Sequence, residues 1–143
     1  MKAQDYLGRI RWNRLKIEQK KNQIEKLKSA AGEIGINMDA PKVQSSHKSD
    51  IADIVARYED LRAEIAEDVL SSQRELDEIV TVIQSVSKTL YADILYKKWI
   101  EDRTLEQIAV DMNYNFYYVK NSYMEALREV EKLIEKDRSF IGL

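Results

Sequence analysis

The sequence predicts an all-α protein, with a long antiparallel helical hairpin of the coiled-coil type and a smaller helical domain after it. Four glycines and one proline occur among 143 residues, well below the roughly 12% of an average protein, so few positions favour turns. Charged residues make up 34% of the chain and hydrophobic residues 44%, a balance typical of amphipathic helices. Apolar residues also recur every seven positions, which is the spacing of helices that pack against helices.

The first helix is predicted over about residues 2–31. Ile10, Ile17, Ile24 and Ala31 follow one another at intervals of seven. Such a repeat keeps one seam facing a partner helix. We therefore expect this helix to pack against a second one.

A loop is expected over residues 32–49, because this segment holds two of the four glycines and the only proline. A second helix over about residues 50–86 follows, with Ser49 or Asp50 as its N-cap. Its apolar side chains form two adjacent lines, which is more than one neighbouring helix covers. The lines consist of Ile51, Tyr58, Ile65, Ile79 and Val86, and of Val55, Val69, Leu76, Ile83 and Leu90. We predict that residues 1–88 form a hairpin that associates into a homodimer or a higher homo-oligomer.

Charge is unevenly distributed along the predicted hairpin. Residues 1–28 carry nine lysines and arginines against three acids, whereas residues 50–78 carry ten acids against three basic side chains. Antiparallel docking would place these opposite charges side by side. The alternative is that the basic surface contacts the phosphates of a nucleic acid.

The C-terminal segment has the spacing of a helix-turn-helix. Thr104 and Gln107 can form a capping box, so we expect a helix to begin at Leu105. Asn113 falls at the tight turn, where a positive φ is required and Asn is tolerated after Gly. Asn115 can then cap the second helix.

The inward positions of this motif are also recognisable. Ile108, Ala109 and Met112 form the apolar side of the short helix, and Val119 faces the core from the second helix. Ser122 occupies an inward position where a larger aliphatic residue is usual. Tyr114 is the apolar residue of the turn.

This stretch, LEQIAVDMNYNFYYVKNSYMEAL, resembles region 4 of bacterial sigma factors, with the likeness extending over residues 90–133. The whole chain is similar to small phage regulators of the RinA and ArpU late-activator type. The resemblance implies a sigma region 4-like helix-turn-helix domain over residues 89–143. It further implies a protein that binds double-stranded DNA and controls transcription of late phage or prophage genes.

The resemblance carries the DNA-reading positions onto the front of the second helix. They are Asn115, Phe116, Tyr117, Tyr118, Lys120 and Asn121. This chain departs from the sigma pattern there, since Arg, Glu and Gln are usual at these positions. A −35-like recognition sequence is therefore not implied, and the aromatic side chains have the alternative role of packing on a protein partner.

Several classes of function are not expected. The chain has no cysteine and one histidine, His47 in a polar stretch, so we predict no metal site, no cofactor and no enzymatic activity. The N-terminal segment lacks the apolar core of a signal peptide, and no run reaches the length of a membrane span. We expect a protein of the bacterial cytoplasm with no membrane contact.

Two alternatives to the transcriptional regulator remain open. One is an interaction protein whose sigma-like domain docks on RNA polymerase or on another phage protein. The other is a phage terminase small subunit, although those proteins usually place the DNA-binding part first in the chain.

Overall fold

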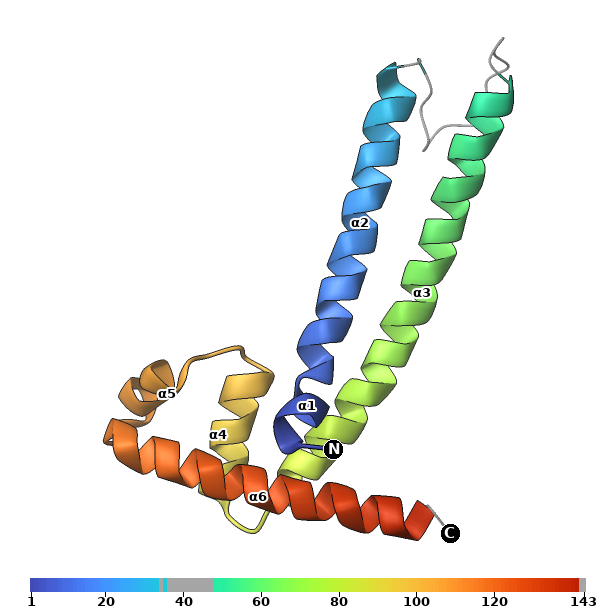
Figure 1. Cartoon of the computed structure of the whole chain (residues 1–143). Helices are drawn as coiled ribbons and strands as arrows, with labels where there is room; N and C mark the ends of the chain where they lie inside the picture. Colours follow the sequence, from blue (N-terminus) through green and yellow to red (C-terminus); the bar gives the residue numbers. More distant parts are fainter. Residues whose placement is uncertain (34, 36–47, 142–143) are drawn as a thin grey trace. The chain divides into compact units, whose positions relative to one another are not determined.

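The computed structural model describes residues 1–33, 35 and 48–141, and over these residues the protein is all-α, without a strand. The predicted fold class is confirmed at this level. Most of the expected loop, with His47, lies outside the described residues. The helices are α1 (Ala3–Leu7), α2 (Arg9–Glu33), α3 (Lys48–Gln84), α4 (Thr89–Trp99), α5 (Leu105–Met112) and α6 (Phe116–Ile141) (Figure 1).

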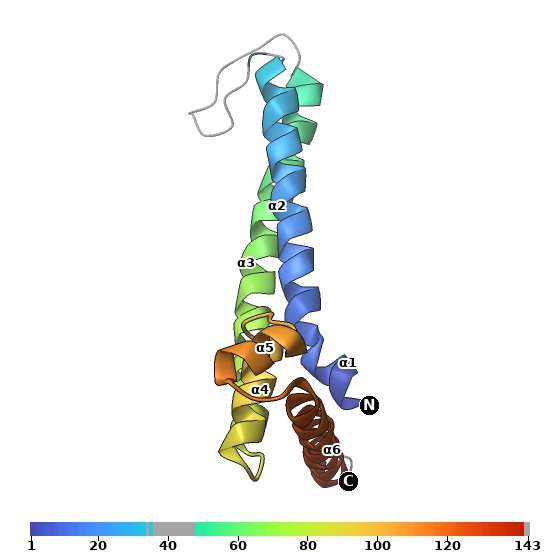
Figure 2. The same cartoon turned by 90° about the vertical axis from the view of Figure 1, so that its left-hand side faces the viewer.

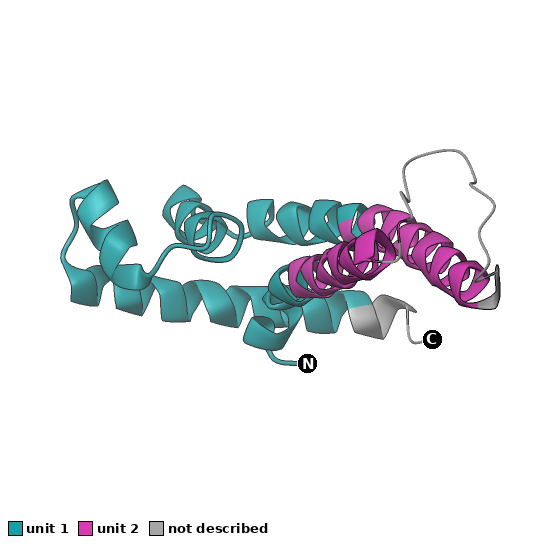
Figure 3. Cartoon of the chain, turned by 90° about the horizontal axis from the view of Figure 1, so that it is seen from above, with its two compact units in different colours: residues 1–12, 73–143 teal, residues 13–72 magenta. Residues whose placement is uncertain are grey.

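The chain divides into two compact units (Figure 3). Unit 1 comprises residues 1–12 and 73–143, and unit 2 comprises residues 13–72. This division differs from the predicted boundary between residues 88 and 89. The reason is that the first and the last segments of the predicted hairpin share one core with the C-terminal helices. Leu7 and Ile83 are buried in this core.

Unit 1 is built around α6, which contacts α1, α4 and α5, while α4 and α5 also contact each other (Figures 1 and 2). Its apolar side chains form a continuous core, the arrangement that supplies most of the stability of a folded domain. The largest fully buried side chains of unit 1 are Leu7, Ile79, Ile83, Ile94, Leu95, Ile108, Val119 and Val130.

The predicted first helix is interrupted at Gly8, between α1 and α2. A Cβ atom at this position would lie 2.9 Å from the backbone oxygen of Gln4, closer than a Cβ atom normally approaches. α1 buries Tyr6 and Leu7 in the core of unit 1, and the backbone N–H of Ala3 donates to Glu131 Oε1 at 3.4 Å. Glycine therefore permits a local bend that lets α1 pack on α6.

In unit 2, α2 and α3 run antiparallel. Lys20 Nζ lies 2.5 Å from Asp68 Oδ2 and 3.8 Å from Glu64 Oε2, while Lys28, later in α2, stacks over the ring of Tyr58, earlier in α3. Among its described residues, the buried side chains are those of Ala31, Tyr58 and Leu61. The unit therefore has ion pairs along its length and a small apolar core.

Across residues 1–33, 35 and 48–141, no helix combines the length and the apolar character that crossing a bilayer requires. The longest helix, α3, spans 37 residues, and its acidic side chains are spread along it.

Candidate nucleic-acid interface

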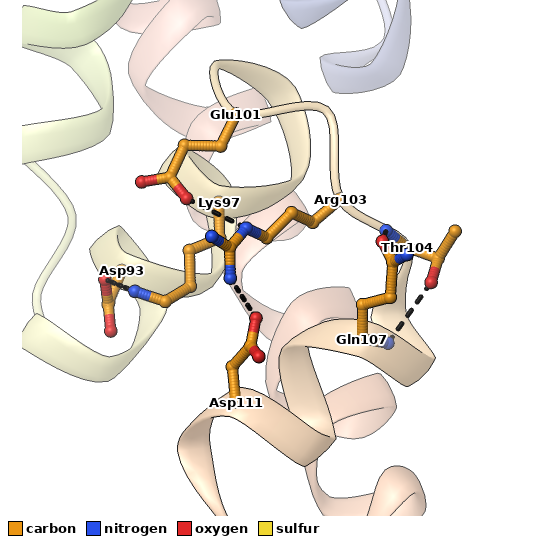
Figure 4. A network of polar contacts seen from close by, with 7 residues as sticks. All are labelled: Asp93, Lys97, Glu101, Arg103, Thr104, Gln107 and Asp111. Atoms are coloured by element: carbon orange, nitrogen blue, oxygen red, sulfur yellow. Dashed lines mark hydrogen bonds and ion pairs between the residues drawn. The ribbon is translucent and has the colours of Figure 1, made fainter.

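The candidate segment begins at the N-terminus of α5, where a capping box fixes the start of the helix. The Thr104 hydroxyl accepts a hydrogen bond from the backbone N–H of Gln107 at 3.2 Å, and Gln107 Oε1 accepts from the backbone N–H of Thr104 at 3.0 Å (Figure 4). These two bonds satisfy donors that the first helical turn leaves unpaired. The predicted helix start at Leu105 is confirmed.

A tight turn joins α5 to α6. Asn113 has φ 61° and ψ 40°, the left-handed conformation that Asn tolerates better than most residues. Asn115 Oδ1 then accepts a hydrogen bond from the backbone N–H of Tyr117 at 2.8 Å, as an N-cap side chain does. The turn and the cap predicted at these two positions are confirmed, and together they set the direction in which α6 leaves the turn.

The inward face of this segment is apolar and tightly packed. Ile108 and Val119 are completely buried, and Ala109 is nearly so. Ser122 is also buried, at 7% exposure, so its small side chain occupies an inward position as the spacing predicts. Because one side of α6 is fixed in the core, the opposite side is held toward solvent.

The solvent-facing side of the front of α6 carries most of the predicted site residues. Tyr117 is 70% exposed and Tyr118 49%, and the side chains of Lys120 and Asn121 are exposed as well. Asn115 is exposed but its carboxamide oxygen is engaged as the cap. Phe116 is half-buried and packs against the core of unit 1, so it is the least accessible member of the set.

Two ring contacts order the aromatic side chains. The Tyr114 and Tyr118 ring centroids lie 5.1 Å apart, and Phe116 meets Tyr117 in an edge-on contact at 5.6 Å. Tyr114 was expected as the apolar turn residue, yet 47% of it is exposed. Its ring therefore extends the exposed surface of α6 instead of filling the core.

Sequence reasoning missed further exposed residues of this surface. Starting from Tyr117, the steps of four, three and four residues lead to Asn121, Met124 and Arg128, which share one face of a helix. Met124 is 45% exposed, and Arg128 is exposed too. The helical spacing was the available signal. We call Tyr117, Asn121, Met124 and Arg128 the α6 row.

Several basic side chains near this surface are already engaged by acids. Arg103 bonds to Glu101 Oε2 at 3.1 Å and to Asp111 (Figure 4). These contacts tie the loop before α5 to the last turn of α5. The guanidinium of Arg103 is therefore partly neutralised before any ligand arrives.

Lys97 and Arg128 are engaged in the same way. Lys97 bonds to Asp93 Oδ1 at 3.0 Å, and Arg128 pairs with Glu125 one turn away. For Lys120, by contrast, no ion pair is present within the described part of the chain. Lys120 is accordingly a cation of this surface that is available to an anionic partner.

Behind the exposed face, two tyrosine hydroxyls are removed from water. Burial raises the pKa of Tyr6 to about 12, and burial also raises the pKa of Tyr123 above its usual value. Desolvation penalises the charged phenolate in both cases. Both side chains therefore stay neutral over the physiological pH range and act as core residues.

Comparisons with known proteins assign no role to this surface. Comparison with family models, with curated proteins and with solved structures finds no match to the chain. Among the described residues, no three His, Cys, Asp or Glu side chains come together as candidate metal ligands.

Proposed function

We propose that the protein is a sequence-specific, double-stranded-DNA-binding regulator of transcription, of the kind that phages and prophages use for late genes, without enzymatic activity. In this proposal α5 and α6 act as a helix-turn-helix, with α6 as the helix that enters the major groove. The observation that carries the proposal is the combination of the left-handed turn at Asn113 with exposed Tyr117, Lys120 and Asn121 directly after it.

Exposed side chains at the front of α6 have contacts that their chemistry favours. Asn121 can bond an adenine edge with both atoms of its carboxamide. Lys120 can neutralise a phosphate, and the hydroxyl of Tyr118 can donate to a phosphate oxygen. The absence of any acid from position 113 to position 124 removes the repulsion that DNA would otherwise meet there.

Association of the chain through unit 2 completes the proposal. The described residues of this unit bury three apolar side chains, while Ile17, Ile24 and Ile65 stay half-exposed on α2 and α3. A second copy packed on these helices would cover that surface. A dimer of this kind would read two half-sites separated by one or two turns of DNA.

One observation favours a second candidate, in which the same surface docks on RNA polymerase or on another phage protein. Val110 is 79% exposed and Tyr117 70%. Exposed apolar and aromatic side chains are enriched at protein interfaces. In that case the aromatic side chains would contact protein and the chain would have no affinity for DNA alone.

Binding of the full chain to random duplex DNA at low salt distinguishes the two. A DNA-binding regulator binds such a duplex through phosphate contacts and loses affinity as salt is raised. Retained binding at low salt, followed by enrichment of particular sequences on selection, supports the proposal. Complete absence of DNA binding at low salt, together with capture of RNA polymerase, would support the docking protein instead.

A further inference from the structure

We propose that the α6 row selects A·T base pairs, by covering thymine methyl groups with Tyr117 and Met124 and by bonding an adenine edge with Asn121. This inference rests on the proposed function and names the class of DNA sequence that the surface would read. The inference rests on two observations. The exposed face contains side chains that can recognise A·T base pairs, and the nearby arginines that could recognise guanine are engaged in ion pairs.

The geometry of the row suits a short stretch of base pairs. Its three base-reading members extend from Tyr117 to Met124, seven positions apart, so at 1.5 Å per residue they span about 10 Å. Bases follow one another at about 3.4 Å along a strand, so this span matches about three base pairs. Asn121 stands between Tyr117 and Met124, which places a carboxamide between two apolar side chains.

The groups that recognise G·C pairs are scarce on this face. Bidentate recognition of guanine needs an Arg or Lys, and recognition of cytosine needs an Asp or Glu. Arg128 is paired with Glu125, and Arg103 is held by two acids. Lys120 is an exposed cation for which no such partner is present among the described residues, and a lysine can contact a phosphate as well as a guanine.

The groups that recognise A·T pairs are present. Adenine offers a donor and an acceptor that match a carboxamide, and thymine offers a methyl group that apolar side chains cover. Tyr117 is 70% exposed and Met124 45%, so both have surface left to bury. An adenine flanked by thymines would meet the carboxamide and the two apolar side chains together.

The test begins with selection of bound sequences from a random duplex pool by the full chain. Each thymine of the selected site is then replaced singly by uracil, which removes the 5-methyl group and keeps the base pair. We expect an A·T-rich core in each half-site and an affinity loss of about fourfold for each methyl that is fully covered. In M124A and Y117A the ratio of thymine to uracil affinity should fall toward one at the affected position.

L70A serves as the matched control, because Leu70 is 61% exposed on α3 in unit 2 and lies outside the proposed reading surface. This variant should keep the wild-type thymine-to-uracil ratio at every position, even if its overall affinity changes. A G·C-rich selected site, or uracil substitutions without effect, would overturn the inference and leave a DNA-binding regulator standing. Failure to bind any duplex at low salt would overturn both.

Discussion

The two compact units differ in what holds them together. Unit 1 buries a continuous set of apolar side chains from α1, α4, α5, α6 and the adjoining ends of α2 and α3. Unit 2 buries Ala31, Tyr58 and Leu61 among its described residues. Its helices are joined additionally by ion pairs such as the one between Lys20 and Asp68.

This difference indicates how each unit is stabilised. Burial of apolar surface contributes about 25 cal/mol per Å², whereas solvent-exposed ion pairs contribute about 0 to 1 kcal/mol each. Unit 1 therefore has the core of an independent domain. Because unit 2 buries few apolar side chains, packing against a further apolar surface would increase its stability more than it would that of unit 1. This is the physical basis for expecting a second copy there.

The largest effect is expected from a charge placed in the core of unit 1. V119D should cost several kcal/mol, because Val119 is completely buried in the apolar core of unit 1 and burying a charge there is expensive. Thermal unfolding followed by circular dichroism should show a large loss of stability, and DNA binding should disappear. V110D is the matched control, since Val110 is 79% exposed. Equal melting of V119D and wild type would show that the assigned core face is incorrect.

A charge in unit 2 should act differently. Y58D removes one of the few buried side chains of this unit, so we expect weaker association and a smaller loss of helical structure than in V119D. Sedimentation equilibrium at micromolar concentration measures the association directly. A wild-type protein that sediments only as a species near the 16.7 kDa chain mass would contradict the proposed role of unit 2.

Alkaline pH should destabilise unit 1 through its buried tyrosines. Because the folded-state pKa of Tyr6 is about 12 and an unfolded tyrosine has a pKa near 10, the unfolded state loses its proton first as pH rises. Stability contributed by the neutral hydroxyl is complete below pH 10 and is lost between about pH 10 and pH 12. Y6F should reduce this loss by about 1 to 2 kcal/mol in urea unfolding at pH 11.5. An unchanged pH dependence in Y6F would contradict the assigned burial.

A smaller effect is expected from releasing a cation near α5. D111N removes one of the two acids that engage Arg103, so DNA affinity at low salt should rise a few-fold. If Arg103 then reaches a phosphate, the slope of log affinity against log salt steepens by about 0.9 per subunit. D93N, which releases Lys97, is the companion variant. Weaker DNA binding in D111N would show that the Arg103 pair supports the reading surface instead of competing with DNA.

The structural features that the sequence predicted are mainly those that depend on neighbouring residues. The capping box at Thr104 and the left-handed turn at Asn113 depend on residues within a few positions, and the structure contains both. The bend at Gly8 and the division into units depend on which distant side chains share a core, so spacing along one helix did not indicate them. The pairing of Arg103 with Asp111 spans a loop and most of α5, and the sequence carried no signal for it.

Among the predicted site residues, Tyr117, Lys120 and Asn121 are exposed. Their role in reading DNA stays a prediction. The reading positions implied by the resemblance end at Asn121. Met124 was therefore not predicted as a surface residue, although it lies on the same face of the helix one turn later. Phe116 was predicted as a reading position, but its side chain packs against the core of unit 1. Its position next to the cap turns it in that direction.

The central claim is that α6 reads bases, and a competition titration of N121A on the selected duplex and on a scrambled duplex tests it most directly. The account predicts a loss of about 1 to 3 kcal/mol on the selected duplex and almost none on the scrambled one, because a base contact contributes only where the base is present. K120A should weaken both duplexes alike, as a phosphate contact does. Equal losses for N121A on the two duplexes, or no loss on either, would contradict the claim.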